Sequence, residues 1–529
     1  MSKGNFAKAA GIMVVAVFLS RILGLVRESV IAAQLGQGEM AGIYKMAFRL
    51  PDLLYFLIAG GALSSAFVPV FTEYLSTGRE KEAWKIYSVI ASVMGIVIGV
   101  FIVIGLIFTR QLVPLIAWGF NDAQLDQTAH LTRILLPAQW CFFIGGLTMG
   151  TLYARRQFLI PSLGPIVYNV GIIIAGIWLI PRMGADGLAW GALAGALFGN
   201  LLLQLWYSAR LGVDFKFSLD TSHPGVRKVF MLMLPVILGL GLPQIDVLIN
   251  QSFATLISAK AVAAIDNANR LMQVPLGIFG QAAGIAALPA LSTYFAQKDW
   301  DSYKDTLSFG VRSVFFATIP SAAFMIVLSR PMISLVLEAG KFTHADTVYA
   351  AQALVWYSLG VFAWGGQAVM ARGFYAMQDT VTPVVIGTIM TIIFVPLNWI
   401  LMKAMGHSGL ALATSIMAIL YLVALSAVLA KKVNGIGAWR ILTSTAKITA
   451  ASGVAAGAAY GVSIMPMVTA RAESVASVKL CAALQLLPAL FVGSVAYIAC
   501  CHLLKVEESR YFYMMIARRF SKSSGEAAA

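Results

Sequence analysis

The chain has 529 residues, of which 59% are hydrophobic and only 12% charged, and its formal net charge is +15. So high an apolar fraction excludes an ordinary soluble domain and indicates a polytopic membrane protein. The four cysteines lie inside apolar runs without a CxxC pair, which excludes a disulfide or zinc framework.

A membrane-spanning helix needs roughly 20 mainly apolar residues, and the sequence predicts an all-α integral membrane protein with about fourteen of them. In chain order these spans lie near residues 8–34, 40–73, 84–109, 128–154, 160–180, 186–208, 226–256, 261–296, 307–329, 346–376, 381–404, 408–430, 440–466 and 477–504. The first apolar run is longer than a signal peptide and no small-residue cleavage site follows it, so we expect it to be retained as a span.

Lys and Arg residues outside these spans gather on one side of the predicted topology. That side holds pairs such as Arg155 with Arg156 and Lys431 with Lys432, whereas the opposite side holds isolated residues such as Arg110. The positive-inside rule makes the basic side cytoplasmic, which predicts that both termini are cytoplasmic. The positive charge therefore reflects membrane topology, and no nucleic-acid partner is expected.

The two halves of the sequence resemble each other. Segment Ala47–Gly78 is similar to segment Ala268–Asp299, which aligns Arg49 with Arg270. Each copy contains six spans, an even number, so both copies have the same orientation in the membrane. The sequence thus predicts two six-helix parallel-repeat lobes around a central cavity, followed by two extra C-terminal helices.

The repeat also sets the expected domain boundaries. The predicted organisation is an N-lobe of spans 1–6 at residues 1–222, a C-lobe of spans 7–12 at 223–437, two additional helices at 438–505 and a basic cytoplasmic tail at 506–529. Within the sixth span, glycines recur at every fourth residue from Gly187 to Gly199. This spacing predicts a ridge for close helix packing.

Several charged side chains are predicted at bilayer depth. They are Arg21, Arg27 and Glu28 on span one, Lys45, Arg49 and Asp52 on span two, and Asp266 and Arg270, with Gln273 nearby, on span eight. A central Arg costs about 2.5 to 3.5 kcal/mol on insertion scales. Five cations against three carboxylates leave a surplus of two, which favours an aqueous cavity that binds an anion such as a diphosphate.

A structural interpretation of these charges stays open at this point. Arg21 could pair with Glu28, Lys45 or Arg49 with Asp52, and Arg270 with Asp266, only to hold the helices together. The sequence contains no GxxxxGK loop and no HExxH motif. No cofactor, no metal ion and no enzymatic activity are therefore expected.

Five motifs resemble a known family over essentially the whole chain. They are SRILGLVRES at residues 20–29, AFRLPDLL at 47–54, GALSSAFVPVFTEY at 61–74, NRLMQVPLGIFG at 269–280 and GKFT at 340–343. Together they are similar to the MurJ (MviN) lipid II flippases of the multidrug/oligosaccharidyl-lipid/polysaccharide exporter superfamily. The resemblance implies fourteen helices, a cationic central cavity between two lobes, and a groove on the last two helices that takes the polyprenyl tail.

The resemblance also implies a set of site residues. Arg21, Arg27 and Arg270 match the important arginines of the family, and Glu28 stands where an acidic residue is usual. The full expected set consists of substrate-binding Arg21, Arg27, Arg49 and Arg270, supported by Glu28, Lys45, Asp52, Asp266 and Gln273.

The chain departs from the family pattern at three positions. Tyr55, Gly42 and Gly60 stand where the family usually has charged residues. In this interpretation Lys45 and Arg49 supply the missing cation.

The expected function is a flippase that moves lipid II from the cytoplasmic to the outer leaflet of a bacterial inner or plasma membrane by alternating access. The expected partners are lipid II or a similar polyprenyl-diphosphate glycolipid and membrane lipids, with cell-wall synthesis proteins as candidates. A flippase for another polyprenyl-linked glycan, of the O-antigen type, remains an alternative because the carrier and diphosphate are identical. A cation-coupled multidrug exporter is disfavoured, since it would be expected to have twelve spans and an acidic cavity.

Overall fold

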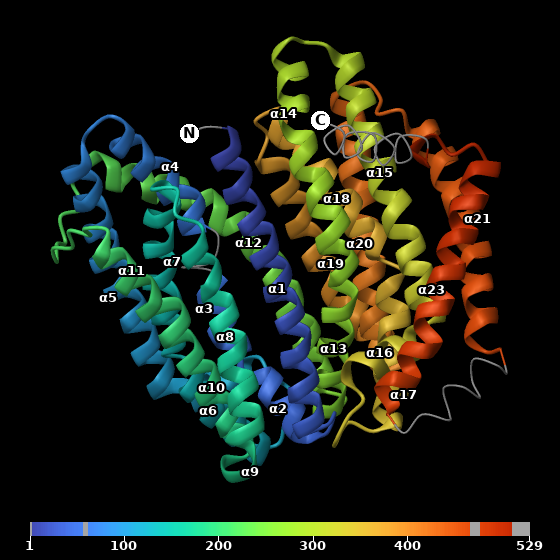
Figure 1. Ribbon diagram of the computed structural model, residues 1–529, viewed down its shortest axis with the longest axis horizontal. Helices are drawn as coiled ribbons and strands as arrows, with labels where there is room; N and C mark the ends of the chain where they lie inside the picture. The colour runs from blue at the N-terminus through green and yellow to red at the C-terminus, as the bar shows by residue number, and fades with distance from the viewer. Residues whose placement is uncertain (1–2, 57–61, 466–476, 510–529) are drawn as a thin grey trace, which may run out of the picture. The chain divides into compact units, whose positions relative to one another are not determined.

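The computed structural model describes residues 3–56, 62–465 and 477–509 (Figure 1). In these residues the regular structure is helical, apart from one isolated bridge between Ala339 and Phe342. The prediction of an all-α fold is therefore confirmed. The chain divides into two compact units: Met1–Ala263 with Ala339–Thr343 form unit 1, and Ala264–Glu338 with His344–Ala529 form unit 2.

Unit 1 contains the helices up to α12 and the start of α13. They are α1 (Lys3–Leu35), α2 (Glu39–Ala47), α3 (Arg49–Leu54), α4 (Ala62–Ser76), α5 (Glu80–Leu112), the short η2 (Val113–Leu115), α6 (Asp122–Leu135), α7 (Ala138–Ala154), α8 (Leu159–Trp178), α9 (Ile180–Met183), α10 (Ala185–Gly195), the π-helix η3 (Ala196–Leu202), α11 (Leu203–Arg210), α12 (Pro224–Thr255) and α13 (Ala259–Pro275).

Unit 2 contains the rest of α13 and the helices that follow. They are the π-helix η4 (Leu276–Gly280), α14 (Gln281–Ala296), α15 (Trp300–Val327), α16 (Ser329–Leu337), α17 (His344–Ser358), α18 (Val361–Ala376), α19 (Val381–Met405), α20 (His407–Lys432), α21 (Ala438–Ser463) and α23 (Val478–Leu503).

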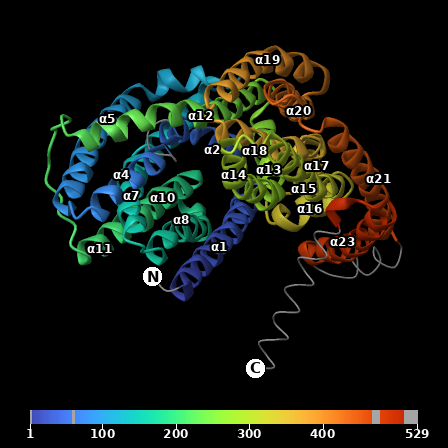
Figure 2. The same cartoon turned by 90° about the horizontal axis from the view of Figure 1, so that it is seen from above.

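In unit 1, α8 packs between α1 and α10, and Figure 2 shows α8 beside α10. The glycine ridge predicted for the sixth span allows the two helices to pack this closely. A Cβ added at Gly191 would lie only 2.2 Å from the Cβ of Ala175. At Gly195 and Gly199 the added atom would meet backbone oxygens of α8 at 2.8 and 2.7 Å. The predicted role of these glycines in packing is confirmed.

In unit 2, the last two helices pack side by side, as both views show (Figures 1 and 2). α21 lies against α15, and α23 lies against α16. The tight fit includes Gly493 of α23, where an added Cβ would lie 2.7 Å from the Phe324 ring and 2.9 Å from Ala459 of α21.

A buried ion cluster joins α15 to the segment that follows α23. Arg312 has a side chain that is only 4% exposed, and it donates to Glu507 at 2.9 Å and also to Glu508. Glu508 in turn accepts a hydrogen bond from Ser444 of α21 at 3.0 Å. A buried charge is tolerated when it is paired in this way, so the cluster fixes three segments of unit 2 to one another.

Several expected spans are interrupted in the structure. The segment expected at 128–154 consists of α6 and α7, with a break at Pro137, which has no N–H to continue the helix. The segment expected at 346–376 consists of α17 and α18, which are bent by 40° at Gly360. The segment expected at 40–73 contains α2, α3 and α4.

By length and composition, eight helices in the described residues can cross a membrane, or nine if α17 and α18 form one span. The long helices α1, α12 and α21 lie outside those eight. The described chain thus has the many apolar helices of a multi-pass membrane protein.

The backbone repeats its conformation at the spacing of the sequence repeat. Residues with positive φ occur in four pairs that are 220 or 222 residues apart: Gly78 with Lys298, Arg156 with Gln378, Gly184 with Gly406, and Gly212 with Asn434. The unit boundary after Ala263 reflects packing and not the repeat. The domain boundary after residue 222 stays a prediction, and most of the expected tail at 506–529 lies outside the described residues.

Candidate functional site

Glu28 lies at the centre of a buried polar network in unit 1. Its side chain is 7% exposed and accepts hydrogen bonds from Arg27 of the same helix, at 2.6 Å, and from Lys45 of α2. The Lys45 side chain is 5% exposed. One carboxylate thus serves two cations in a region of low dielectric, where ion pairs are strong and unpaired charges costly.

Asn169 of α8 also belongs to this network and was not among the residues expected from the sequence. Its side-chain oxygen accepts from Arg27 at 3.1 Å, and its amide nitrogen donates to the Ser20 carbonyl at 3.3 Å. The Nε of Arg27 is buried without a hydrogen-bond partner. A polar amide inside the apolar run of α8 was the available signal, but 142 residues separate it from Arg27.

The remaining expected residues of unit 1 lie on α1 and α3. Arg21 is exposed on α1, and Arg49 of α3 is 11% exposed with its guanidinium 4.0 Å from Asp52. Asp52 itself is 43% exposed. Arg49 and Asp52 therefore combine a largely buried cation with an accessible carboxylate.

Unit 2 holds the second group of expected residues, all on α13. Arg270 donates from Nε to Asp266 at 2.7 Å, and the two side chains are 41% and 7% exposed. Gln273 donates to Asn269 at 2.5 Å. The buried carboxylate holds the base of the guanidinium while the rest of the Arg270 side chain remains accessible, which suits an anion-binding arginine.

The structure therefore assigns partners within each unit. Of the pairings left open from the sequence, Arg270 with Asp266 and Arg49 with Asp52 occur, whereas Lys45 pairs with Glu28 on another helix. The pairing of Lys45 with Glu28 was not among those expected, because it depends on the turn after α1 that returns α2 toward Glu28.

The structure shows the neighbours of two of the three residues that depart from the family pattern. At Gly42 an added Cβ would lie 2.0 Å from the Ala259 carbonyl oxygen, so no side chain fits between α2 and the start of α13. Tyr55 packs edge-on against Phe56 and Phe142 with ring centroids 5.4 and 5.7 Å apart. Gly60 lies outside the described residues.

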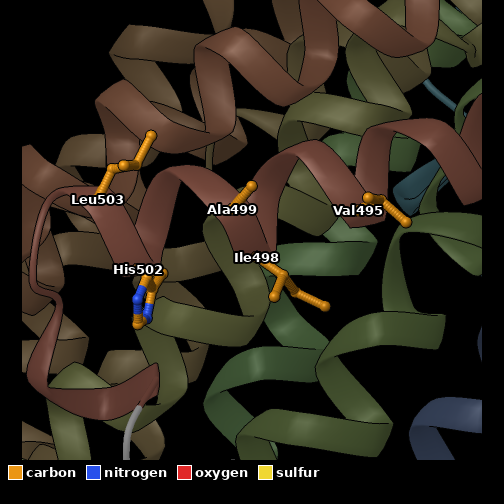
Figure 3. Close-up of a pocket in the computed structure, with 5 residues that line it drawn as sticks. All are labelled: Val495, Ile498, Ala499, His502 and Leu503. Carbon is orange, nitrogen blue, oxygen red and sulfur yellow. The ribbon is translucent and has the colours of Figure 1, made fainter.

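The outer surface of α23 carries an apolar hollow of about 690 Å³ (Figure 3). The described residues that line it are Val495, Ile498, Ala499, His502 and Leu503. In the described part of the chain, no group of three or more His, Cys, Asp or Glu residues is placed to hold a metal ion.

Comparison with known proteins matches residues 31–477 to the family model "Lipid II flippase MurJ". A "Probable lipid II flippase MurJ" of Vibrio cholerae is 32% identical over 423 residues, which cover 78% of this chain and 80% of that protein. A "Lipid II flippase MurJ" of Burkholderia cenocepacia is 30% identical over 406 residues, covering 75% of this chain and 78% of the relative.

Solved structures show the same fold at lower sequence identity. "Lipid II flippase MurJ, inward closed conformation" superposes with a TM-score of 0.76 at 22% identity, covering 93% of this chain and 98% of that one. An inward-facing MATE-family multidrug resistance transporter of the MOP superfamily gives a TM-score of 0.67 at 12% identity, covering 80% and 98%.

Proposed function

The chain belongs to the MurJ family of lipid II flippases, and from this membership we propose that it carries lipid II from the cytoplasmic to the outer leaflet by alternating access. It is a membrane transporter of peptidoglycan biosynthesis, not an enzyme. Lipid II is the substrate, and proteins of cell-wall synthesis are proposed as further partners.

The proposed topology has fourteen spans in two six-helix lobes around a central cavity, with α21 and α23 as the additional pair. The four pairs of positive-φ residues support two copies of one unit. The charge asymmetry of the loops supports cytoplasmic termini and an inner or plasma membrane location. The proposed lobes extend over residues 1–222 and 223–437, with the extra helices at 438–505 and the basic tail from 506.

The proposed substrate-binding residues are Arg21, Arg27, Arg49 and Arg270, and they bind the diphosphate. The observation that carries this proposal is the sharing of Glu28 by two cations, Arg27 and Lys45. The network thus gathers a guanidinium and an ammonium group at one carboxylate, and both are groups that bind phosphate oxygens. Glu28, Lys45, Asp52, Asp266 and Gln273 position the arginines when the site is empty.

The membrane potential can drive the proposed transport step. Moving one negative charge outward down an inside-negative membrane potential releases about 2.3 kcal/mol per 100 mV. ATP hydrolysis is then unnecessary, provided that the arginines stay in place while the diphosphate moves. The polyprenyl tail is proposed to stay in lipid along the apolar hollow of α23, whose lining is suited to an isoprenoid chain.

The test replaces single arginines in cells depleted of their own flippase. Arg27→Ala and Arg270→Ala are expected to abolish growth, because each removes a cation that the diphosphate requires. Arg133→Ala is the matched control, since Arg133 is exposed on α6 and its guanidinium donates to the backbone carbonyl of Leu106. Full rescue by correctly inserted Arg27 and Arg270 variants would contradict the proposed diphosphate site.

The same assay separates lipid II from an O-antigen-type glycan. We expect the wild-type chain to restore peptidoglycan synthesis in flippase-depleted cells and to leave a strain that lacks an O-antigen flippase uncorrected. The opposite pattern would favour the alternative glycan, which shares the carrier and the diphosphate.

A further inference from the structure

The linker between α11 and α12 runs along α5 as an extended segment and not as a free loop. It comprises residues 211–223 and is the green loop at the left edge of Figure 1. Residues 213–220 have no helical turn. The linker and α5 both belong to unit 1.

Two serines of α5 hold this linker through its backbone. The N–H of Lys216 donates to the Ser88 hydroxyl at 3.0 Å, and the N–H of Ser218 donates to the Ser92 hydroxyl at 3.3 Å. Ser88 also donates to the Asp214 carbonyl at 3.4 Å. In a loop surrounded by water, the backbone N–H groups can donate to water. Backbone N–H groups that approach lipid need hydrogen-bond acceptors within the protein instead.

The serines lie beyond the charged end of α5. Lys85 is the last charged residue before an uninterrupted uncharged run that continues to Arg110. Ser92 is seven residues beyond Lys85, which at 1.5 Å per residue is about 10 Å further along the helix. The linker then returns toward the end of α5, where Asp220 pairs with Lys85 at 2.7 Å. It therefore reaches the depth at which α5 becomes apolar.

The outer side of the linker is apolar at alternate residues. Phe215, Phe217 and Leu219 are 51%, 66% and 54% exposed, and the half-exposed Phe215 ring also contacts Tyr87 of α5 edge-on, with ring centroids 6.4 Å apart. Between them, Lys216 has a side chain that is 81% exposed and 3.4 Å from Asp214. An alternation of large apolar groups with a cation is suited to the boundary between headgroups and acyl chains.

An aromatic and cationic pair precedes the linker directly. Trp206 of α11 is 50% exposed, and the Arg210 guanidinium lies 4.1 Å from the centre of its ring. Exposed Trp side chains in membrane proteins mark the headgroup level. This pair directly before the linker is typical of a membrane interface, and Arg210 and Lys216 carry charges that anionic phospholipids attract.

We infer that the 211–223 linker is a lipid-binding segment, in which Phe215, Phe217 and Leu219 insert into the membrane interface and Lys216 contacts anionic headgroups. It anchors the connection between the two sequence repeats to the bilayer, and Ser88 and Ser92 set its depth. This inference requires membrane insertion of the chain but is independent of which lipid it transports.

The test measures the environment of single spin labels on the full chain in nanodiscs of zwitterionic and anionic phospholipid. Cys141, Cys481, Cys500 and Cys501 are first replaced by Ala, and Phe217→Cys then carries the label. The label is expected to be several-fold more accessible to dissolved oxygen than to a water-soluble nickel complex. Leu219→Cys provides a second position if the Phe217 variant folds poorly.

Two positions on α5 calibrate the result. Lys81→Cys, exposed in the first turn, reports water, and Val100→Cys, 52% exposed in the apolar run, reports lipid. Nickel accessibility at residue 217 equal to that at residue 81 would overturn the inference, as would a label shielded from both reagents. Ser88→Ala with Ser92→Ala is expected to increase label mobility at residue 217, and unchanged mobility would overturn the role of the serines.

Discussion

Glu28 is the buried carboxylate that Arg27 and Lys45 share. We predict that Glu28→Gln lowers the free energy of unfolding by about 3 to 5 kcal/mol, because it removes the buried carboxylate charge that Arg27 and Lys45 share. The measurement is denaturant unfolding of the purified variant in detergent. The double variant Glu28→Gln with Lys45→Met should regain part of the loss, and a double variant no more stable than the single one would contradict this coupling.

Asp379, just before α19, makes a pH-dependent contribution to the stability of the folded protein. Its carboxylate accepts from the Thr382 N–H at 3.0 Å and pairs with Lys432. Burial alone would raise the pKa of Asp379, but the hydrogen bonds from Lys432 and Thr382 lower it to about 2.

Because the pKa of Asp379 is lower in the folded state, its stabilising contribution is fully present at pH values above the unfolded-state pKa of about 4. It is then lost as the pH falls toward 2. We therefore predict that Asp379→Asn lowers the Tm by a constant amount between pH 7 and 5, and that the difference from wild type narrows below pH 4. Scanning fluorimetry in detergent measures the Tm of both proteins. A Tm difference that stays the same down to pH 3 would show that the charge of Asp379 does not contribute to stability.

At the scale of single residues, the sequence identified the charged side chains but predicted only some of their pairing partners. Arg270 and Asp266 are four residues apart on one helix, so their pairing follows from helical spacing. Lys45 and Glu28 are joined through a turn, and Asn169 reaches Arg27 from another helix. Such contacts depend on tertiary packing, which local spacing does not determine.

At the scale of single helices, Gly42 allows α2 to pack directly against the backbone at the start of α13. We predict that Gly42→Ala destabilises the protein by about 1 to 3 kcal/mol or more, since overpacking against the Ala259 backbone must move α2 or α13. Gly38→Ala is the matched control, because an added Cβ there meets nothing within 4 Å. Folding yield and Tm in detergent distinguish them, and equal values for the two variants would refute the proposed close contact.

Helix interruptions were only partly predictable. Pro137 marks the break between α6 and α7 because proline cannot donate to the helical ladder. The π-helical stretch Ala196–Leu202 has no such marker, since it arises where the sixth span packs against α7 and α8. Composition thus predicted the helices, while the packed neighbours determined where their geometry changes.

At the scale of the whole molecule, the repeat predicts equal behaviour at equivalent positions. Gly184 and Gly406 have φ of 60° and 59° with ψ of −141° and −136°, a region that side chains disfavour. We predict that Gly184→Ala and Gly406→Ala each cost about 1 to 3 kcal/mol. Gly457→Ala, where an added Cβ meets nothing within 4 Å, should be neutral or slightly stabilising. Unfolding in detergent tests this, and a cost at only one repeat position would contradict their equivalence.

The ion cluster of Arg312 has a consequence for biosynthesis. Its partners Glu507 and Glu508 lie 195 and 196 residues further along the chain. A ribosome must therefore add all of those residues before the guanidinium in α15 obtains its counter-charges. A nascent chain released inside that stretch retains Arg312 without these two carboxylates, and an unpaired charge buried in this way is strongly destabilising.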